Sequence, residues 1–327
     1  MSIQTAKKPF STILRVPSMS KVSSLLVLVI ILAVMFVVFS ILTPRFLTVS
    51  NILSVLRQAS SLFMLACGQT LVVLVKGLDL SQGSTVGLVS VVVAMITLLN
   101  GPFMGILLGL LAGILIGLIS GFTIAKAKVP AFAATLGMMF IVEGITLIIT
   151  NGQPIFGLSE DSWFTYIGAG LIGRMPFPAI LFIVVAILFY FILKYTRFGR
   201  YLYAIGGNDE AARLSGIQVE RWMILAYVVN GLLVATGAII LTSRVNSGQP
   251  LLGGGIMMES VGAVVIGGTS LFGGIGGIFQ TLLGVCFLAY MVNGLTIMGM
   301  STFVRQTLVG ALIIIAVYLS AKRTKNK

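Results

Sequence analysis

The residues best suited to chemistry lie in one short polar stretch, GLDLSQGS (residues 77–84), between two long apolar runs. Its glycines are expected to interrupt the helical backbone around Asp79, Ser81 and Ser84. Interrupted backbone at membrane depth is tolerated where it is buried in protein or lines a cavity. A carboxylate and two hydroxyls at such a break indicate a translocation path or its inner gate. The alternative is that Asp79 or Ser81 caps the next helix, because an anion is favoured at a helix N-terminus.

Uncharged polar residues elsewhere within the apolar runs, or at their ends, could line a path for a polyhydroxylated solute. Each of them could equally form a hydrogen bond between two helices, so the composition of the runs does not decide between these roles. The full set of path or gate candidates is Gln58, Ser60, Gln69, Asp79, Ser81, Ser84, Asn230 and Asn293.

Ionisable groups within the apolar runs are costly in a bilayer and are functional hypotheses by default. Glu143 lies in the middle of a run, and Glu259 lies near the start of another. Arg57, Arg244 and Arg305 lie toward the ends of runs. A structural alternative is that Glu259 pairs with Arg305.

Catalytic, metal and nucleotide chemistry find little support in the residue types. The chain has no histidine, which removes the usual general base and the commonest metal ligand. Cys67 and Cys286 both lie in apolar runs, and the eight carboxylates are scattered. The second glycine cluster, GGTSLFGGIGG, lacks the Lys-Ser/Thr end of a phosphate-binding loop. We therefore expect no enzyme activity, no metal, no cofactor and no nucleotide hydrolysis by the chain itself.

The composition is that of an integral membrane protein. Hydrophobic residues make up 58% of the 327 residues and charged residues 9%, against about 45–50% and about 25% in soluble domains. The formal charge of +13 comes from Lys and Arg placed between apolar segments, so we expect membrane topology rather than nucleic acid to explain it.

Ten apolar segments, each a candidate membrane span, must position the polar residues. Sixteen of the 21 Lys and Arg then fall on the side of the N-terminus, which predicts that both termini are cytoplasmic. The expected parts are a cytoplasmic segment (1–24), a transmembrane domain (25–320) with an outer loop (151–178) and an inner loop (194–221), and a basic cytoplasmic tail (321–327). The spans are expected at residues 25–42, 55–75, 83–99, 103–124, 131–149, 179–193, 222–241, 256–267, 275–297 and 304–320.

The chain also repeats a glycine pattern. An apolar run followed by G-x-x-L-x-x-G occurs at residues 72–84 and again at residues 263–275. Both copies follow a span that heads inward, so the pattern predicts two parallel structural repeats. The expected fold is an all-α integral membrane protein of about ten transmembrane helices, with two parallel repeats and short broken helices.

The inner loop (194–221) holds eight of the 29 charged residues and contains a short helix of its own. Asn208 is the expected N-cap, acidic residues 209 and 210 begin the helix, and Gly216 ends it. Ala211 and Leu214, three residues apart, provide a small apolar face. Because so short a helix is marginal in water, it needs a surface to rest on. That surface is either a soluble partner or the remainder of the same protein.

Three sequence stretches, in order, resemble a known family. FGRYLYAIGGNDEAARLSGI resembles the coupling loop of permease subunits of ribose-type ATP-binding-cassette importers, the branch that carries sugars and the autoinducer-2 signal. GLDLSQGS and GGTSLFGGIGG resemble its two glycine signatures. The chain departs from the pattern at Gln82, where a small apolar residue is usual, and at Gln280, where glycine is frequent. These departures put in doubt any substrate inferred from a relative.

The resemblance implies a permease of the bacterial inner membrane that forms the path for a sugar-like solute. It implies a cytoplasmic ATPase subunit, an extracytoplasmic solute-binding protein and a second permease, identical or similar, as partners. The rival hypothesis is an ion-coupled secondary transporter, for which only Glu143 is a clear midspan carboxylate. The residues expected to contact the ATPase are Gly207, Asn208, Asp209, Glu210, Ala211, Ala212, Arg213, Leu214, Gly216 and Ile217.

Overall fold

The computed structural model describes residues 24–160 and 162–325, which form thirteen helices and one two-stranded hairpin. The predicted N-terminal segment, apart from Ser24, and the last two residues of the predicted tail lie outside the described residues. The elements are α1 (Ser24–Leu42), α2 (Val49–Leu74), α3 (Gln82–Asn100), α4 (Pro102–Ala125), α5 (Ala131–Thr150), α6 (Trp163–Ala169), β1 (Leu171–Ile172), β2 (Met175–Pro176), α7 (Phe177–Tyr195), α8 (Arg197–Gly207), α9 (Asp209–Leu214), α10 (Val219–Val245), α11 (Gly254–Ile266), α12 (Ile278–Ile297) and α13 (Thr302–Lys325).

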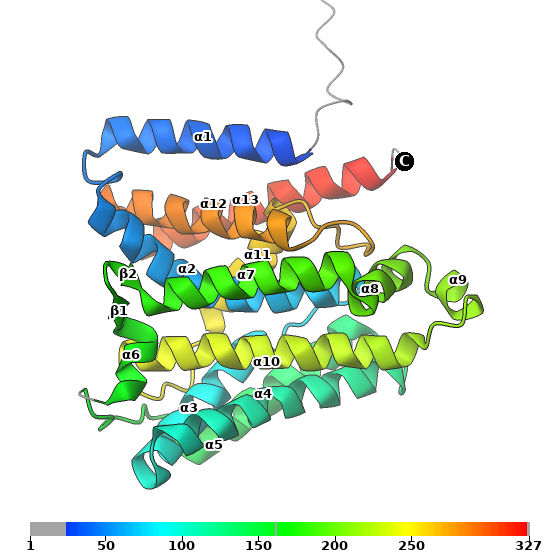
Figure 1. Ribbon diagram of the computed structural model, residues 1–327, viewed down its shortest axis with the longest axis horizontal. Coiled ribbons are helices and arrows are strands. Elements are labelled where there is room, and N and C mark those ends of the chain that lie inside the picture. Colours follow the sequence, from blue (N-terminus) through cyan, green and yellow to red (C-terminus); the bar gives the residue numbers. More distant parts are fainter. Residues whose placement is uncertain (1–23, 161, 326–327) are drawn as a thin grey trace, which may run out of the picture.

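The ten predicted apolar segments each correspond to a helix. Among the described residues, eight helices are long and apolar enough to cross a membrane, and α11 and the apolar part of α13 are shorter. Figure 1 shows the long helices side by side, with α1 at one edge, α8 and α9 at one end, and α6 with the hairpin at the other. The fold is therefore an all-α integral membrane protein, as predicted.

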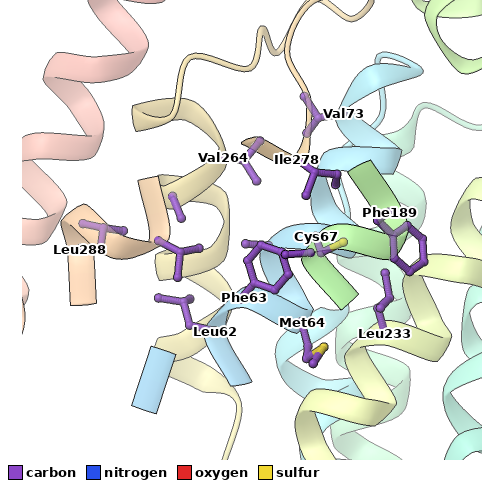
Figure 2. Close-up of a cluster of buried hydrophobic side chains, with 14 of the residues drawn as sticks. Leu62, Phe63, Met64, Cys67, Val73, Phe189, Leu233, Val264, Ile278 and Leu288 are labelled. Carbon is purple, nitrogen blue, oxygen red and sulfur yellow. The ribbon is translucent and has the colours of Figure 1, made fainter. Parts of the chain in front are cut away.

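Helix α2 runs through the centre of the main hydrophobic core. Its Phe63, Met64 and Cys67 are fully buried and cluster with Leu233 of α10 and Val264 of α11 (Figure 2). Helix α1, in contrast, is buried over only 17% of its most apolar window. Exposed apolar side chains on such a helix are what a lipid environment permits, since lipid tails are as apolar as leucine.

Small residues allow α4 and α10 to approach closely. A Cβ added at Gly113 of α4 would meet the carbonyl oxygen of Gly231 in α10, and a Cβ added at Gly231 would meet that of Gly113. Gly117 meets the Tyr227 carbonyl in the same way. Close backbone contact of this kind supplies packing energy between membrane helices, where the hydrophobic effect contributes little.

The two glycine motifs both fall where helices break, between α2 and α3 and between α11 and α12. Their backbones nevertheless differ. Gly268 and Gly274 have positive φ angles of 97° and 70°, whereas their sequence counterparts Gly77 and Gly83 do not, and Gly83 lies within α3. The sequence pattern therefore predicts the two breaks but not the conformation of the chain within them.

Candidate gate and coupling surface

The first break begins as α2 ends in a tight turn. The amides of Val75 and Gly77 both donate to the Val72 carbonyl, and Lys76 takes a left-handed conformation with φ 63°. The chain then runs to Ser81, the N-cap residue of α3. This geometry turns Asp79 into the protein, where only 4% of its surface is exposed.

Three hydrogen bonds satisfy the Asp79 carboxylate. Its Oδ1 accepts from the backbone amide of Ser81 at 2.8 Å and from the Ser81 hydroxyl at 2.6 Å. Its Oδ2 accepts from Nδ2 of Asn230, in the middle of α10, at 2.5 Å. The Ser81 side chain makes no capping bond to α3. Asp79 and Ser81 are therefore joined to α10 and do not serve only as a cap of α3.

A relay of amides extends from Asp79 to α11. Asn230 Oδ1 accepts from Nε2 of Gln82 at 2.8 Å, and that Nε2 also donates to the Leu65 carbonyl of α2 at 3.1 Å. Gln82 Oε1 in turn accepts from the Ser260 hydroxyl at 2.7 Å. We call Asp79, Ser81, Gln82, Asn230 and Ser260 the Asp79 network. The side chains of the last four are fully buried, and together they connect the first break to α3, α10 and α11.

Close packing fixes the position of the Asp79 network. A Cβ added at Gly68 of α2 would collide with Oδ1 of Asn230, so glycine is needed for α2 to pass this amide. The hydroxyl of Thr135 in α5 donates to the Leu78 carbonyl at 3.0 Å and ties the break to a further helix. The carboxylate thus lies at the meeting point of helices from across the bundle.

The structure brings three of the eight predicted path residues together, namely Asp79, Ser81 and Asn230. Ser84 lies next to them and donates to the Ser81 carbonyl. The others lie apart: Gln58 is exposed, Ser60 donates to the Leu56 carbonyl of its own helix, Asn293 pairs with Asn51, and Gln69 is fully buried with neither amide atom hydrogen-bonded.

Sequence reasoning missed Gln82 and Ser260 as members of the site. In the sequence, Gln82 stands out only as a departure from the family pattern, and its partner Ser260 lies 178 residues further along the chain. The usable signal was the polar amide itself, placed beside a buried carboxylate where a small apolar residue is usual.

The short helix of the inner loop forms as predicted. Asn208 caps α9, its Oδ1 accepting from the Ala211 amide at 2.9 Å, and Gly216 follows with φ 82°. Of the predicted contact residues, Leu214 is 85% exposed, and the others are exposed apart from Ala212 and Ile217.

The apolar face predicted for α9 does not rest on the remainder of the described chain. Ala211 and Leu214 both face outward, and the buried residue is Ala212, with 4% of its surface exposed. In a helix of six residues, two apolar positions do not fix which side turns inward. The packing of Ala212 against its own protein fixes it instead, and this leaves Leu214 free at the surface.

Ion pairs hold the charged residues of α9 to the bundle. Lys76 Nζ lies 3.2 Å from Asp209 Oδ1, and Arg213 lies 2.7 Å from Glu220, which also pairs with Lys128 at 3.3 Å. The hydrogen bond from Lys76 lowers the pKa of the Asp209 carboxyl below its ordinary value. The first break, through Lys76, therefore contacts the first residue of α9 directly.

The backbone of the second break supports the end of α8. A Cβ added at Gly206 would collide with the Leu74 carbonyl and with the Gly274 amide, and that amide donates to the same carbonyl at 3.0 Å. The Tyr203 hydroxyl donates to the Gly276 carbonyl at 2.8 Å. We call Leu74, Gly206 and Gly274 the glycine junction. Here α2, α8 and the second break meet without intervening side chains.

The charged residues at the other end of the bundle form no ion pair among the described residues. Arg305 donates to the hydroxyls of Thr296 and Thr302, and it is not within ion-pair distance of Glu259. The structural alternative of a Glu259–Arg305 pair is therefore not seen. Over the same residues, no three acidic, cysteine or histidine side chains gather as a metal site would require.

A bundle of apolar spans, a buried polar break and an exposed short helix connected to that break define a membrane transport subunit. The chain belongs to the permease family described as "Branched-chain amino acid transport system / permease component", whose model matches residues 51–317. Members are permease components of importers and not enzymes, and the match places the chain in the inner membrane as a multi-span permease.

Individual relatives cover almost the whole chain. The ribose import permease RbsC of Bacillus subtilis is 44% identical over 90% of this chain and 91% of its own. RbsC of Escherichia coli K12 is 38% identical over 92% and 93%, and the L-arabinose permease AraH of the same strain is 37% identical over 92% and 91%. No solved structure shows a significant match.

Proposed function

We propose that the chain is the translocation subunit of an ATP-binding-cassette importer for a sugar-like solute, driven by a separate ATPase that docks on α9. The observation that carries this proposal is the glycine junction, where α8 rests directly on the ends of both helix breaks. The family match favours this reading over the ion-coupled alternative.

Coupling would pass along contacts already described. An ATPase that moves α9 also moves Asp209, which is paired with Lys76 at the start of the first break. The same movement displaces Gly206 against Leu74 and Gly274. Because Asp79 lies three residues beyond Lys76, a shift at either contact reaches the Asp79 network, and its hydrogen bonds to Asn230 would break or re-form as the path opens and closes.

The sugar assignment rests on the relatives. Their names specify ribose and L-arabinose, and they align over more than nine-tenths of their own length. Buried amide and hydroxyl side chains occur both in the Asp79 network and apart from it, and such groups hydrogen-bond sugar hydroxyls. Gln69 is the best candidate for direct contact, since an unpaired buried amide costs about 1–3 kcal/mol and a solute hydroxyl would satisfy it.

The remaining partners follow from orientation. With both termini in the cytoplasm, α8 and α9 face the ATPase and the opposite end faces a solute-binding protein. At that opposite end, Arg57 and Arg244 each have a buried guanidinium nitrogen without a hydrogen-bond partner, and neither forms an ion pair with a described residue. Two unpaired guanidinium groups fit an acidic surface on that protein. The second permease would be identical or similar.

The test uses Leu214→Glu, because Leu214 is exposed and its replacement should leave the fold intact. Reconstituted with its ATPase and binding protein in proteoliposomes, the variant should lose at least about tenfold in ATP-driven ribose uptake and in ATPase co-purification. Arg221→Gln, exposed at the same end but outside residues 208–217, is the matched control and should retain both. Undiminished uptake by Leu214→Glu would contradict the docking role, and uptake that ignores ATP would contradict the class of importer.

A further inference from the structure

A cavity of about 500 Å³ opens near the glycine junction, and the proposed coupling route from α9 to the Asp79 network does not involve it. The end of α7, the middle of α8 and the start of α12 surround it, at the end of the bundle where Figure 1 shows α8. Two cations, Lys194 and Arg200, line the cavity, and no carboxylate does.

Neither cation has an acidic partner among the described residues. Lys194 Nζ donates to the Tyr190 hydroxyl at 3.0 Å and lies over two rings, 5.2 Å from the centroid of Tyr190 and 5.3 Å from that of Tyr195. Arg200 donates to the Tyr195 carbonyl at 3.1 Å. These contacts hold the two side chains in place without neutralising them, so the positive charge of the cavity remains available to an anion.

The start of α12 adds to this positive potential. Gly277 at the N-cap position and the next three residues, Ile278, Phe279 and Gln280, all line the cavity, and no side chain caps the helix. The first amides of a helix lack intrahelical acceptors and form the positive end of its dipole. Gln280 adds an amide side chain that can donate to an oxygen.

Aromatic side chains on and beside the cavity, here called its rim, are exposed. Phe279 lines the cavity and is 48% exposed. Phe191 and Tyr195 contact the lining residues Tyr190 and Lys194, and they are 52% and 59% exposed. Helix α7 is one of the candidate spans, so these rings lie where a spanning helix leaves the hydrocarbon layer. Aromatic side chains favour that depth, and basic pockets between spanning helices at the cytoplasmic side bind acidic lipid headgroups.

We propose that this cavity binds the phosphate headgroup of an anionic phospholipid from the cytoplasmic leaflet. The phosphate lies between Lys194, Arg200 and the first amides of α12, and the acyl chains follow Phe191 and Phe279 outward. A bound lipid would connect α7, α8 and α12 beside Tyr203, whose hydroxyl already holds the second break. It would therefore stabilise the surface on which α8 rests.

The test measures lipid binding to the full-length permease in detergent by native mass spectrometry, titrating phosphatidylglycerol and, separately, zwitterionic phosphatidylcholine. Wild type should prefer phosphatidylglycerol. Lys194→Gln/Arg200→Gln should bind it roughly 25-fold more weakly, about fivefold for each cation removed. The loss for phosphatidylcholine should be much smaller, because its choline cation offsets the charge of its phosphate. Arg197→Gln, exposed on the same helix but outside the cavity, is the matched control and should stay within about twofold of wild type.

Two further measurements separate loss of charge from a damaged fold, and binding of a lipid from binding of free phosphate. Lys194→Arg/Arg200→Lys keeps both charges and should bind like wild type, which separates lost charge from a damaged fold. Inorganic phosphate at millimolar concentration should not displace the lipid, because it lacks the chains that contact the rim. An equal loss in Arg197→Gln, no loss in the double Gln variant, or binding of inorganic phosphate in place of the lipid would each overturn the proposal.

Discussion

The two helix breaks share a sequence pattern but are held by different parts of the chain. The first is fixed by side chains, with the Asp79 carboxylate bonded to Ser81 and Asn230. The second is fixed mainly by backbone, with left-handed residues at Gly268, Gly273, Gly274 and Gly276 and amide–carbonyl bonds such as Gly274 to Leu74. The side chains of Tyr203, Thr269 and Ser270 add single hydrogen bonds to it.

This difference separates two tasks. A break held by side-chain hydrogen bonds can exchange one set of partners for another, which suits a gate. A break held by glycine backbone leaves no room for a side chain and would transmit displacement directly, which suits a contact with α8, next to the proposed docking helix α9. The comparison predicts that the second break tolerates no added atoms, whereas the first tolerates changes that preserve hydrogen bonding.

The largest effect is expected from Gly274→Ala. A Cβ there would lie 2.9 Å from the Gly207 amide nitrogen and would also occupy a left-handed conformation at φ 70°. Overpacking of about 1–3 kcal/mol and conformational strain of about 1–2 kcal/mol together predict a loss of about 2–5 kcal/mol in stability. A fall in the midpoint of thermal unfolding in detergent, with loss of uptake, would be measured.

Gly299→Ala separates the overpacking at Gly274 from the conformational strain of a left-handed residue. Gly299 has a similar φ of 78°, but nothing lies within 4 Å of an added Cβ, so only the strain of about 1–2 kcal/mol applies. If the two variants unfold at the same temperature, the close contact with α8 contributes nothing and the comparison between the breaks fails.

Asp79→Ala should cost about 2–4 kcal/mol, because it leaves Asn230 Nδ2 and the Ser81 amide as buried donors without an acceptor. Asp79→Asn should cost only about 1–2 kcal/mol. In Asp79→Asn the new side-chain amide donates where Oδ2 accepted. If the amides of Asn230 and Gln82 rotate by 180°, Asn230 Oδ1 accepts from the new amide and Gln82 Oε1 accepts from Asn230 Nδ2. The bond from Gln82 to the Leu65 carbonyl is then lost. Thermal unfolding of both variants, side by side with wild type, checks the order; an Asn variant as unstable as the Ala variant would exclude the relay.

Gln82→Met should cost about 1–3 kcal/mol, since it keeps the volume of the side chain but leaves Asn230 Oδ1 without its donor. Ser260→Ala should cost less, about 1 kcal/mol, because the single hydroxyl proton of Ser260 is shared between Gln82 Oε1 and the Met257 carbonyl. The two losses should not add, and a double-mutant cycle should give a coupling of about 0.5–1.5 kcal/mol. Strict additivity would mean that Gln82 and Ser260 act independently.

The sequence predicts those features that depend on local chemistry or on the bilayer. Ten apolar runs became ten helices because a span needs about 20 apolar residues, and Asn208 caps α9 because its side chain reaches an amide three residues on. The Asp79 network required more. Its bonds from Gln82 to Ser260 and from Asp79 to Asn230 join residues 178 and 151 positions apart, and only the packing of α3, α10 and α11 brings them together. The side on which α9 packs, through Ala212, depends on tertiary packing in the same way.

The smallest effect on stability is expected at the Lys76–Asp209 ion pair, which joins the first break to α9. Lys76 and Asp209 are 41% and 63% exposed, so solvent screens their ion pair, and Asp209→Asn should change stability by less than about 0.5 kcal/mol. The pKa of Asp209 is lowered in the folded protein, so its small contribution is present above the ordinary carboxyl pKa and is lost as pH falls through the lowered value. If α9 is the docking helix proposed above, uptake should nevertheless fall severalfold, because this contact joins α9 to the first break. Thermal unfolding and ATP-driven uptake, measured on the same preparation, separate the effect on stability from the effect on transport. A variant that keeps full uptake would exclude this ion pair as a route between α9 and the first break.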